Sequence, residues 1–142
     1  RLPDGPVQQS EVLSGNGVTT AVALATLDLL EAGGCYAQLD ETADTLASRL
    51  AEEVRGAGVE AHVSRVGSMI TLAFGSGPTT DAETARKVDR VAYGKFFAAM
   101  LAEGVLLPPG PHEPMFLSLA HGEAEVDTFV KAARRALKSL GE

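Results

Sequence analysis

Hydrophobic and polar positions divide the chain into segments with different periodicities. From about residue 16 to residue 31 the residues are apolar on nearly every side, and no charge occurs between Val18 and Leu27. This pattern is typical of a helix that is packed all round. Gly33 and Gly34 predict its end. The next segment, residues 36–54, is amphipathic, because its apolar residues repeat at helical spacing with charged residues between them.

The middle of the chain predicts two strands and a third helix. Residues 59–64 alternate between apolar and polar side chains, which is typical of a half-buried strand. Residues 69–74 predict a second strand after a break at Gly67 and Ser68. A third helix is expected near residues 82–103.

The last part of the chain predicts two short strands and a final helix. Residues 105–107 are expected to form a third strand and residues 116–119 a fourth. Residues 108–114 contain four prolines and are expected to be irregular, because proline removes backbone donors and fixes φ. The final helix has its apolar face between Val126 and Leu140. The sum predicts an α+β fold: a small three- to four-stranded, mostly antiparallel sheet covered by helices and preceded by a long apolar helix.

Composition narrows the class of protein. The chain has 142 residues, of which 45% are hydrophobic and 22% charged, as in globular domains. Its formal net charge of −7 argues against a nucleic-acid surface, which needs clustered lysine and arginine. Cys35 is the single cysteine, so an internal disulfide and a cysteine-rich zinc site are excluded, and no metal site is expected. No apolar run reaches the length of a membrane span. We expect a soluble, cytoplasmic protein without membrane or nucleic-acid partners.

The start of the first helix is the first candidate site. Ser14, Gly15 and Asn16 form a polar turn directly before the apolar segment. A helix start collects backbone N–H groups that lack helical partners, and such a point can receive an anion. The alternative interpretation is a capped core helix with no ligand.

Several sequence blocks occur in one order along nearly the whole chain. In that order the chain resembles the C-terminal part of glutamate-1-semialdehyde 2,1-aminomutase, a class III aminotransferase of pyridoxal phosphate (PLP) fold type I. The blocks are Gly5-Pro6-Val7, Leu13-Ser14-Gly15-Asn16, Leu24-Ala25-Thr26-Leu27-Asp28-Leu29-Leu30, Arg65-Val66-Gly67-Ser68-Met69, Phe96-Phe97-Ala98-Ala99-Met100-Leu101, Glu103-Gly104-Val105 and Phe116-Leu117-Ser118-Leu119-Ala120-His121.

The resemblance implies a domain organisation. Residues 1–13 would be an irregular lead-in from a large cofactor domain, residues 14–34 an interdomain helix, and residues 35–142 the small C-terminal domain. The parent enzyme would use PLP for amino-group transfer, in tetrapyrrole precursor synthesis for the aminomutases, and would be a homodimer. The family's cofactor lysine lies upstream of these blocks, so we expect this segment alone to bind no PLP and to be inactive.

The resemblance also assigns candidate residues. Glu11 and Val12 stand where the family has the Gly-Thr pair that contacts the PLP phosphate of the partner subunit. Valine lacks the hydroxyl donor, and losing a hydrogen bond to a charged group costs roughly 1.5–3 kcal/mol. Glu11 adds a carboxylate that repels the phosphate. We therefore expect this contact to be weakened or lost; Ser14, Gly15 and Asn16 are weaker cofactor-binding candidates.

Glu113 matches a carboxylate in the family's substrate-side loop. One interpretation is a group that orients an amine or a water molecule; the other is a solvent-exposed loop acid. Two alternatives for the whole chain also remain open. The first alternative to an enzyme domain is a freestanding, non-catalytic interaction or dimerisation domain derived from this family, and the second is an unrelated small α+β ligand-binding module.

Overall fold

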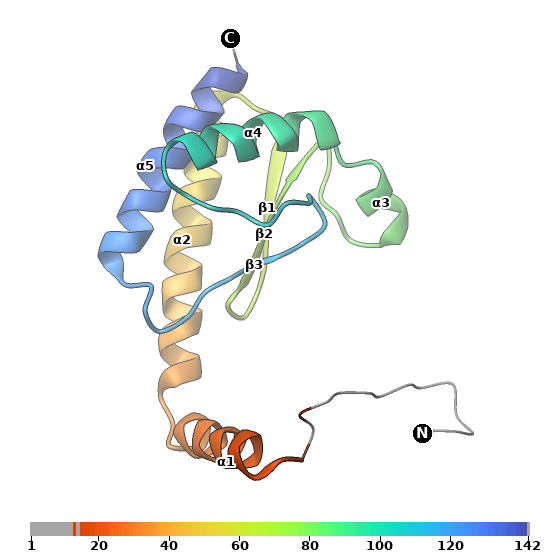
Figure 1. Ribbon diagram of the computed structural model, residues 1–142. Helices are drawn as coiled ribbons and strands as arrows, with labels where there is room; N and C mark the ends of the chain where they lie inside the picture. The colour runs from red at the N-terminus through yellow and green to blue at the C-terminus, as the bar shows by residue number, and fades with distance from the viewer. Residues whose placement is uncertain (1–12, 14, 142) are drawn as a thin grey trace, which may run out of the picture. The chain divides into compact units, whose positions relative to one another are not determined.

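The computed structural model describes residues 13 and 15–141, and these form two compact units. The first unit comprises Arg1–Gly34 and the second Cys35–Glu142. Within the described residues of the first unit, helix α1 spans Gly17–Glu31. The second contains three strands and the helices α2 (Cys35–Ala57), α3 (Ala82–Arg86), α4 (Arg90–Ala102) and α5 (Glu123–Leu140) (Figure 1).

Helix α1 forms where the sequence predicts it. The side-chain oxygen of Asn16 caps its start by accepting from the backbone N–H groups of Val18, at 2.9 Å, and Thr19, at 3.0 Å. None of its residues is buried. Leu29 and Val18 are each 74% exposed. The sequence predicts a helix packed all round, yet among the described residues α1 stays exposed.

Helices α2 and α5 pack side by side against the sheet (Figure 1). Both are amphipathic, and each buries its apolar face: Ala43, Leu46, Leu50 and Val54 in α2, and Val126, Val130, Ala132, Ala133, Ala136 and Leu137 in α5. Two ion pairs link their exposed margins. Arg49 contacts Asp127 at 2.7 Å, and Arg134 contacts Glu53 at 2.6 Å.

The sheet is antiparallel and has the strand order β1-β2-β3. Strand β1 spans Ala61–Val66, β2 Met69–Phe74 and β3 Met115–Phe116. The register places Val66 opposite Met69 and Met69 opposite Phe116. Because side chains alternate along a strand, these three share one face of the sheet. The predicted α+β fold with an antiparallel sheet is confirmed.

The third predicted helix, residues 82–103, is wrong in one respect, because it is two helices. Asp81 caps α3, and Asp89 caps α4 by accepting from the N–H groups of Val91 and Ala92. The backbone N–H of Asp89 donates instead to the carbonyl of Phe74, at 2.8 Å. Because this N–H bonds to the end of β2, it is not part of the hydrogen-bond pattern of a helix. The helix is therefore interrupted before Asp89.

The predicted strand at residues 105–107 is also wrong, and the one at 116–119 is shifted. Residues 105–107 have no strand partner in the described sheet, and β3 pairs through Met115 and Phe116. Leu107 is buried nonetheless, whereas Leu106 is 76% exposed. Alternating burial imitates a strand pattern, although the backbone here forms no ladder.

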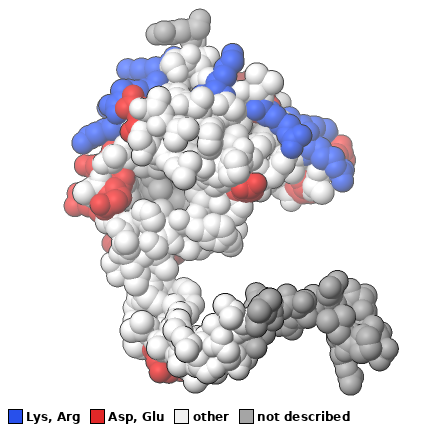
Figure 2. Space-filling model, in the orientation of Figure 1, with Lys and Arg blue, Asp and Glu red and all other residues white. Residues whose placement is uncertain are grey.

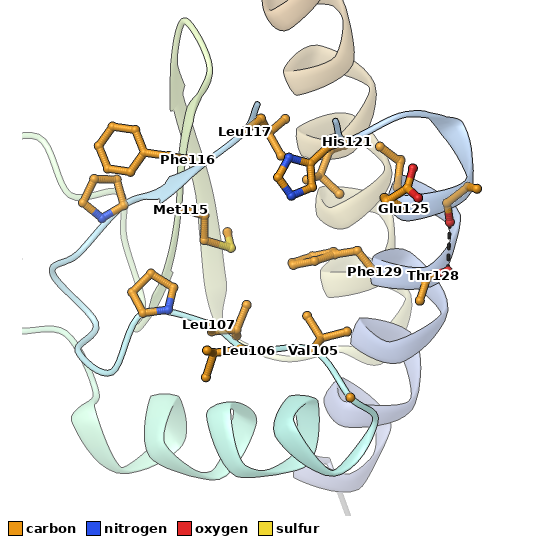
Figure 3. A pocket seen from close by; sticks show the side chains of 16 residues that line it. Val105, Leu106, Leu107, Met115, Phe116, Leu117, His121, Glu125, Thr128 and Phe129 are labelled. Atoms are coloured by element: carbon orange, nitrogen blue, oxygen red, sulfur yellow. Dashed lines mark hydrogen bonds between the residues drawn. The ribbon is translucent and has the colours of Figure 1, made fainter. Parts of the chain in front are cut away.

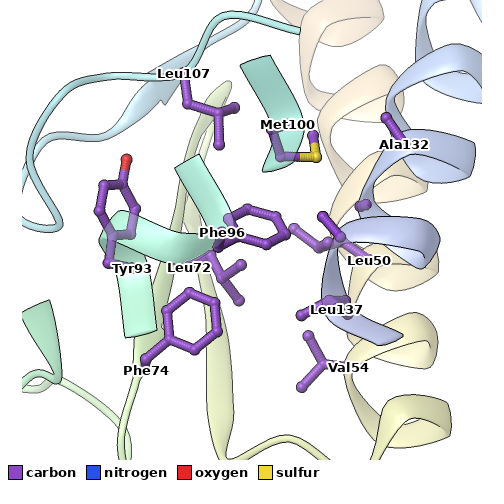
Figure 4. Packing of buried hydrophobic residues seen from close by; sticks show 12 residues of the cluster. Leu50, Val54, Leu72, Phe74, Tyr93, Phe96, Met100, Leu107, Ala132 and Leu137 are labelled. Atoms are coloured by element: carbon purple, nitrogen blue, oxygen red, sulfur yellow. The ribbon is translucent and has the colours of Figure 1, made fainter. Parts of the chain in front are cut away.

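The core lies between β2 and the helices (Figure 4). Phe74 packs against Phe96 with ring centroids 5.5 Å apart, and Phe74 meets Tyr93 edge-on at 6.4 Å. Leu50, Met100 and Leu137 close the same cluster and are fully buried. Helix α4 therefore packs against both the sheet and α5. Its end at Ala102 is held by this packing, and the segment of residues 104–108 follows from there.

Charged side chains lie mainly at the margins of the second unit on the face that Figure 2 shows. The middle of that face is largely uncharged. In the described part of the chain, no single helix has the length and apolar composition needed to cross a membrane.

Candidate functional site

An open, mostly apolar groove of about 660 Å³ lies within the second unit (Figure 3). Residues 104–108 form one wall, residues 114–117 a second, and the first half of α5 a third. Phe129 and Met115 point toward each other across it (Figure 3). The lining is almost free of charge, so the groove suits an apolar group or an apolar stretch of chain.

The loop of residues 108–114 joins two walls of this groove, since Pro108 and Pro114 both line it. This loop carries Glu113, which is exposed. Its backbone N–H donates to the carbonyl of Gly110 at 3.2 Å and closes a turn. Pro111 is buried and anchors the middle of the loop. The prolines limit backbone freedom, so Glu113 stands on a braced loop.

Tyr93 ties the loop to the core. Its ring is buried on α4, and its hydroxyl donates to the carbonyl oxygen of Pro108 at 2.6 Å. Burial raises the pKa of Tyr93, and the nearby carboxylate of Glu113 raises it further. Tyr93 is not among the candidate residues that the sequence indicated. A tyrosine at a core position of an apolar helix was the available signal, because a buried phenol requires a hydrogen-bond partner.

Gly110 sits beneath the Glu113 side chain. A Cβ atom added at Gly110 would lie 3.2 Å from Oε1 of Glu113 and 3.7 Å from its Cδ. The carboxylate therefore folds back over a position that has no side chain. Sequence reasoning missed this residue too, because the contact depends on the path of the loop.

His121 shapes the start of α5 and lines the groove. Its Nδ1 accepts from the backbone N–H of Ser118 at 2.9 Å. The backbone N–H of the next residue, Gly122, donates to the side chain of Glu125 at 2.9 Å. These bonds fix the path of the chain at the start of α5.

The first candidate site, at the start of α1, is only partly described. Glu11, Val12 and Ser14 lie outside the described residues, so their predicted role stays a prediction. Gly15 has a left-handed φ of 73°, which favours glycine. The Asn16 side chain is occupied by its capping bonds to Val18 and Thr19. In the described part of this segment, Asn16 acts as a helix cap.

The four lysines of the chain lie at the surface of the described structure. Lys87, Lys95, Lys131 and Lys138 are all exposed, and Lys87 pairs with Glu83 at 2.9 Å. A lysine that reacts with an aldehyde needs a dry pocket that lowers its pKa. Among the described residues, no group of three or more His, Cys, Asp or Glu side chains is arranged to hold a metal ion.

Sequence comparison gives related proteins over nearly the whole chain, although no family model matches it. The chain is 49% identical over 140 residues to the glutamate-1-semialdehyde 2,1-aminomutase of Myxococcus xanthus (strain DK1622). It is 45% identical over 138 residues to that of Thermomicrobium roseum (strain ATCC 27502 / DSM 5159 / P-2). The matches cover 99% and 97% of this chain. The chain spans about a third of these relatives, 32% of each.

Structure comparison gives the same group of proteins. A glutamate-1-semialdehyde-aminomutase from Pseudomonas aeruginosa PAO1 matches 97% of this chain and 31% of its own, with a TM-score of 0.80 and 20% identity. A lysine-to-alanine variant of that protein is known in complex with PMP. A β-phenylalanine aminotransferase from Variovorax paradoxus matches 92% of this chain and 30% of its own, with a TM-score of 0.75 and 28% identity.

These matches establish the family. The chain belongs to the glutamate-1-semialdehyde 2,1-aminomutase family of class III aminotransferases, and its fold is that of the C-terminal domain of fold type I.

Proposed function

We propose that this chain is the small C-terminal domain of a PLP-dependent aminomutase and acts together with a large cofactor domain. The observation that carries this proposal is the match of nearly the whole chain to one third of each curated aminomutase. The proposed reaction is amino-group transfer on glutamate-1-semialdehyde, the substrate named for those relatives, in tetrapyrrole precursor synthesis. We propose a cytoplasmic homodimer as its setting.

The residues of this chain do not fit covalent PLP binding, because all four lysines are exposed on the surface. We therefore derive no step of the amino transfer from them. PLP, where it is bound, supplies the carbonyl that takes up the amino group, and its lysine would belong to the cofactor domain. The proposed contribution of this domain is the apolar groove and the carboxylate of Glu113.

Glu113 is the carboxylate proposed to face the substrate. It is exposed, it stands on the braced loop of residues 108–114, and it adjoins the apolar groove. A carboxylate in such a place attracts a positively charged amine and fixes its orientation. It also accepts a proton from a bound water molecule. Both actions need only that the loop holds the carboxylate in position.

Two apolar surfaces support a partner for this chain. Helix α1 buries none of its own residues. In the second unit, Val66, Met69 and Phe116 lie in one row across the sheet and are 71%, 38% and 65% exposed. An apolar row of this kind marks an interaction surface more often than a solvated one. We propose that both surfaces are covered in the complete enzyme.

The intact mass of the protein in its own cells tests the proposal first. A mass well above the 14.7 kDa of this chain is expected. Purified from those cells, the protein should also show PLP absorbance. The separate 142-residue chain, mixed with PLP and borohydride, should give no labelled lysine. Stoichiometric labelling of one of the four lysines would contradict the assignment of the cofactor lysine to another domain.

A second candidate function is a freestanding interaction domain, and the groove favours it. The bond from the Leu117 N–H to the Ser68 carbonyl, at 3.3 Å, shows which residues of β3 direct their backbone groups toward β2. The Phe116 N–H and C=O therefore point away from β2 toward the open edge. That single pair of backbone groups would hold a partner weakly, so the apolar groove lined by Met115 and Phe116 is the surface proposed to bind an apolar segment of a partner protein. A native mass near 14.7 kDa would favour this function over the first.

A further inference from the structure

We propose that Gly110 and Tyr93 are positioning residues that hold the Glu113 carboxylate in one place, Gly110 by leaving room beneath it and Tyr93 by fixing the start of its loop. This inference rests on the proposed function, in which Glu113 faces the substrate. Neither residue is expected to touch the substrate itself.

The Gly110 part of the proposal follows from the close approach of the Glu113 side chain. A Cβ at Gly110 would stand 3.2 Å from Oε1 and 4.0 Å from Cγ of Glu113. Contacts of 3.2 Å are tighter than ordinary van der Waals separation, so the neighbour must yield. That neighbour is the end of a side chain, so the contact is relieved by a shift of the carboxylate by a few tenths of an ångström and not by a shift of the backbone. Alanine at this position should therefore displace the carboxylate without destabilising the fold.

The backbone of Gly110 adds nothing that would obscure this effect. Gly110 is absent from the described glycines with positive φ, so alanine is compatible with its conformation. Gly77 offers a matched control. It also lies in a loop, its φ is likewise not positive, and a Cβ there would meet nothing within 4 Å.

The Tyr93 part of the proposal follows from a single bond at the entrance of the loop. The phenol hydroxyl donates to the Pro108 carbonyl at 2.6 Å, and the ring is held edge-on against Phe74 in the core. Buried Pro111 is the second anchor, and the bond between the Glu113 N–H and the Gly110 carbonyl closes the turn. The position of Glu113 is thus set from the core outward.

The test is a double-mutant cycle in the complete enzyme that contains this chain. The variants are Gly110→Ala, Tyr93→Phe and Glu113→Gln, with both pairs that include Glu113→Gln. Gly77→Ala and Tyr36→Phe are the controls; Tyr36 is 64% exposed. The measurements are kcat/KM for amino transfer and the thermal midpoint of unfolding.

We expect Glu113→Gln to lower kcat/KM at least tenfold. Gly110→Ala should lower it by a smaller factor, since the carboxylate must yield by a few tenths of an ångström, whereas misplacing a group by about 1 Å can cost about a hundredfold. Its thermal midpoint should match that of Gly77→Ala. In the Glu113→Gln background, Gly110→Ala and Tyr93→Phe should have little further effect, because each acts through the carboxylate.

Two results would overturn the inference in distinguishable ways. The first is that Glu113→Gln lowers kcat/KM but Gly110→Ala does not, or that the losses of kcat/KM in the single variants multiply in the double variants. Gly110 and Tyr93 then do not position Glu113, while the proposed function stands. If Glu113→Gln leaves kcat/KM unchanged, the proposed role of Glu113 falls and the inference falls with it.

A spectroscopic titration of the 142-residue chain gives a readout that does not depend on activity. The chain has two tyrosines, so Tyr36→Phe leaves Tyr93 as the single phenol that ionises. Replacing Glu113 by glutamine removes a nearby negative charge and should lower the pKa of Tyr93. An unchanged pKa would show that the carboxylate is not held near the phenol, which contradicts the proposal.

Discussion

Helices α1 and α5 have similar lengths and opposite relations to their surroundings. Helix α1 is the more apolar of the two, with Asp28 and Glu31 as its charged residues, yet it buries nothing. Helix α5 carries charge throughout and buries six residues. The period of the apolar residues, rather than their number, decides whether a helix finds its partner within the same unit. A helix that is apolar on every side signals a partner from elsewhere.

The sharpest test of this contrast exchanges a leucine for alanine in each helix. Leu137→Ala in α5 should lower the free energy of unfolding by about 2–5 kcal/mol, because Leu137 is fully buried and its loss leaves a cavity. Leu29→Ala in α1 should change it by less than about 0.5 kcal/mol, since Leu29 is 74% exposed. Urea unfolding of the 142-residue chain, at low concentration, measures both. Equal losses would mean that α1 belongs to the same cooperative core.

The helix caps give a smaller effect of the same kind. Asp89 and Asn16 each accept from two backbone N–H groups at the start of a helix. Asp89→Ala should cost about 1 kcal/mol of unfolding free energy, because α4 is part of the core. Asn16→Ala should leave the unfolding midpoint unchanged and speed hydrogen exchange at the amides of Val18 and Thr19. A shift of the midpoint by Asn16→Ala would contradict the separation of the two units.

The smallest expected effect is a loss of folding stability at low pH. The hydrogen bond from Arg134 lowers the pKa of Glu53 below its usual value of 4.5, and the bond from Arg49 lowers the pKa of Asp127 below 3.8. A carboxyl group whose pKa is lower in the folded state stabilises the fold above its unfolded pKa. That stabilisation is lost as pH falls through the lower folded value. Both pairs join α2 to α5, so stability should decline below about pH 4.5, with α1 unaffected.

Glu53→Gln isolates one of these pairs. The variant should unfold more readily near pH 7 and show a shallower loss of stability on acidification. Glu52→Gln is the control, because Glu52 is its exposed neighbour in the chain. A Glu53→Gln variant with the parent's acid profile would show that the pair contributes nothing measurable, as many surface pairs do.

The sequence predicted the elements whose periodicity is local. The helix at residues 36–54, the hairpin and the final helix follow from repeats of apolar residues, and each is confirmed within a few residues. The break before Asp89 was missed because Val88, Ala92 and Phe96 keep a helical spacing across it. Aspartate before an apolar run is a capping signal. The bond from the Asp89 N–H to the Phe74 carbonyl, which ends the helical pattern there, is a tertiary contact that the local sequence does not show.

The candidate site was less predictable than the fold. Glu113 came from a resemblance, and its role remains a prediction. Tyr93 acts through a hydrogen bond between a helix and a loop, and Gly110 acts through its lack of a side chain. Neither effect produces a periodic pattern in the sequence. The strand expected at residues 105–107 failed for a related reason, because a strand exists only where a second strand pairs with it.

The two-residue length of β3 bears on how the domain resists misassembly. An edge strand offers its unpaired backbone groups as a template for stacking by foreign chains, which is how fibrils grow. Here the strand is limited to Met115 and Phe116, and Pro114 directly before it lacks a donor. A template this short holds an incoming strand by few bonds. The apolar side chain of Phe116 can thus stand at the rim of the sheet without making that rim a seed for fibrils.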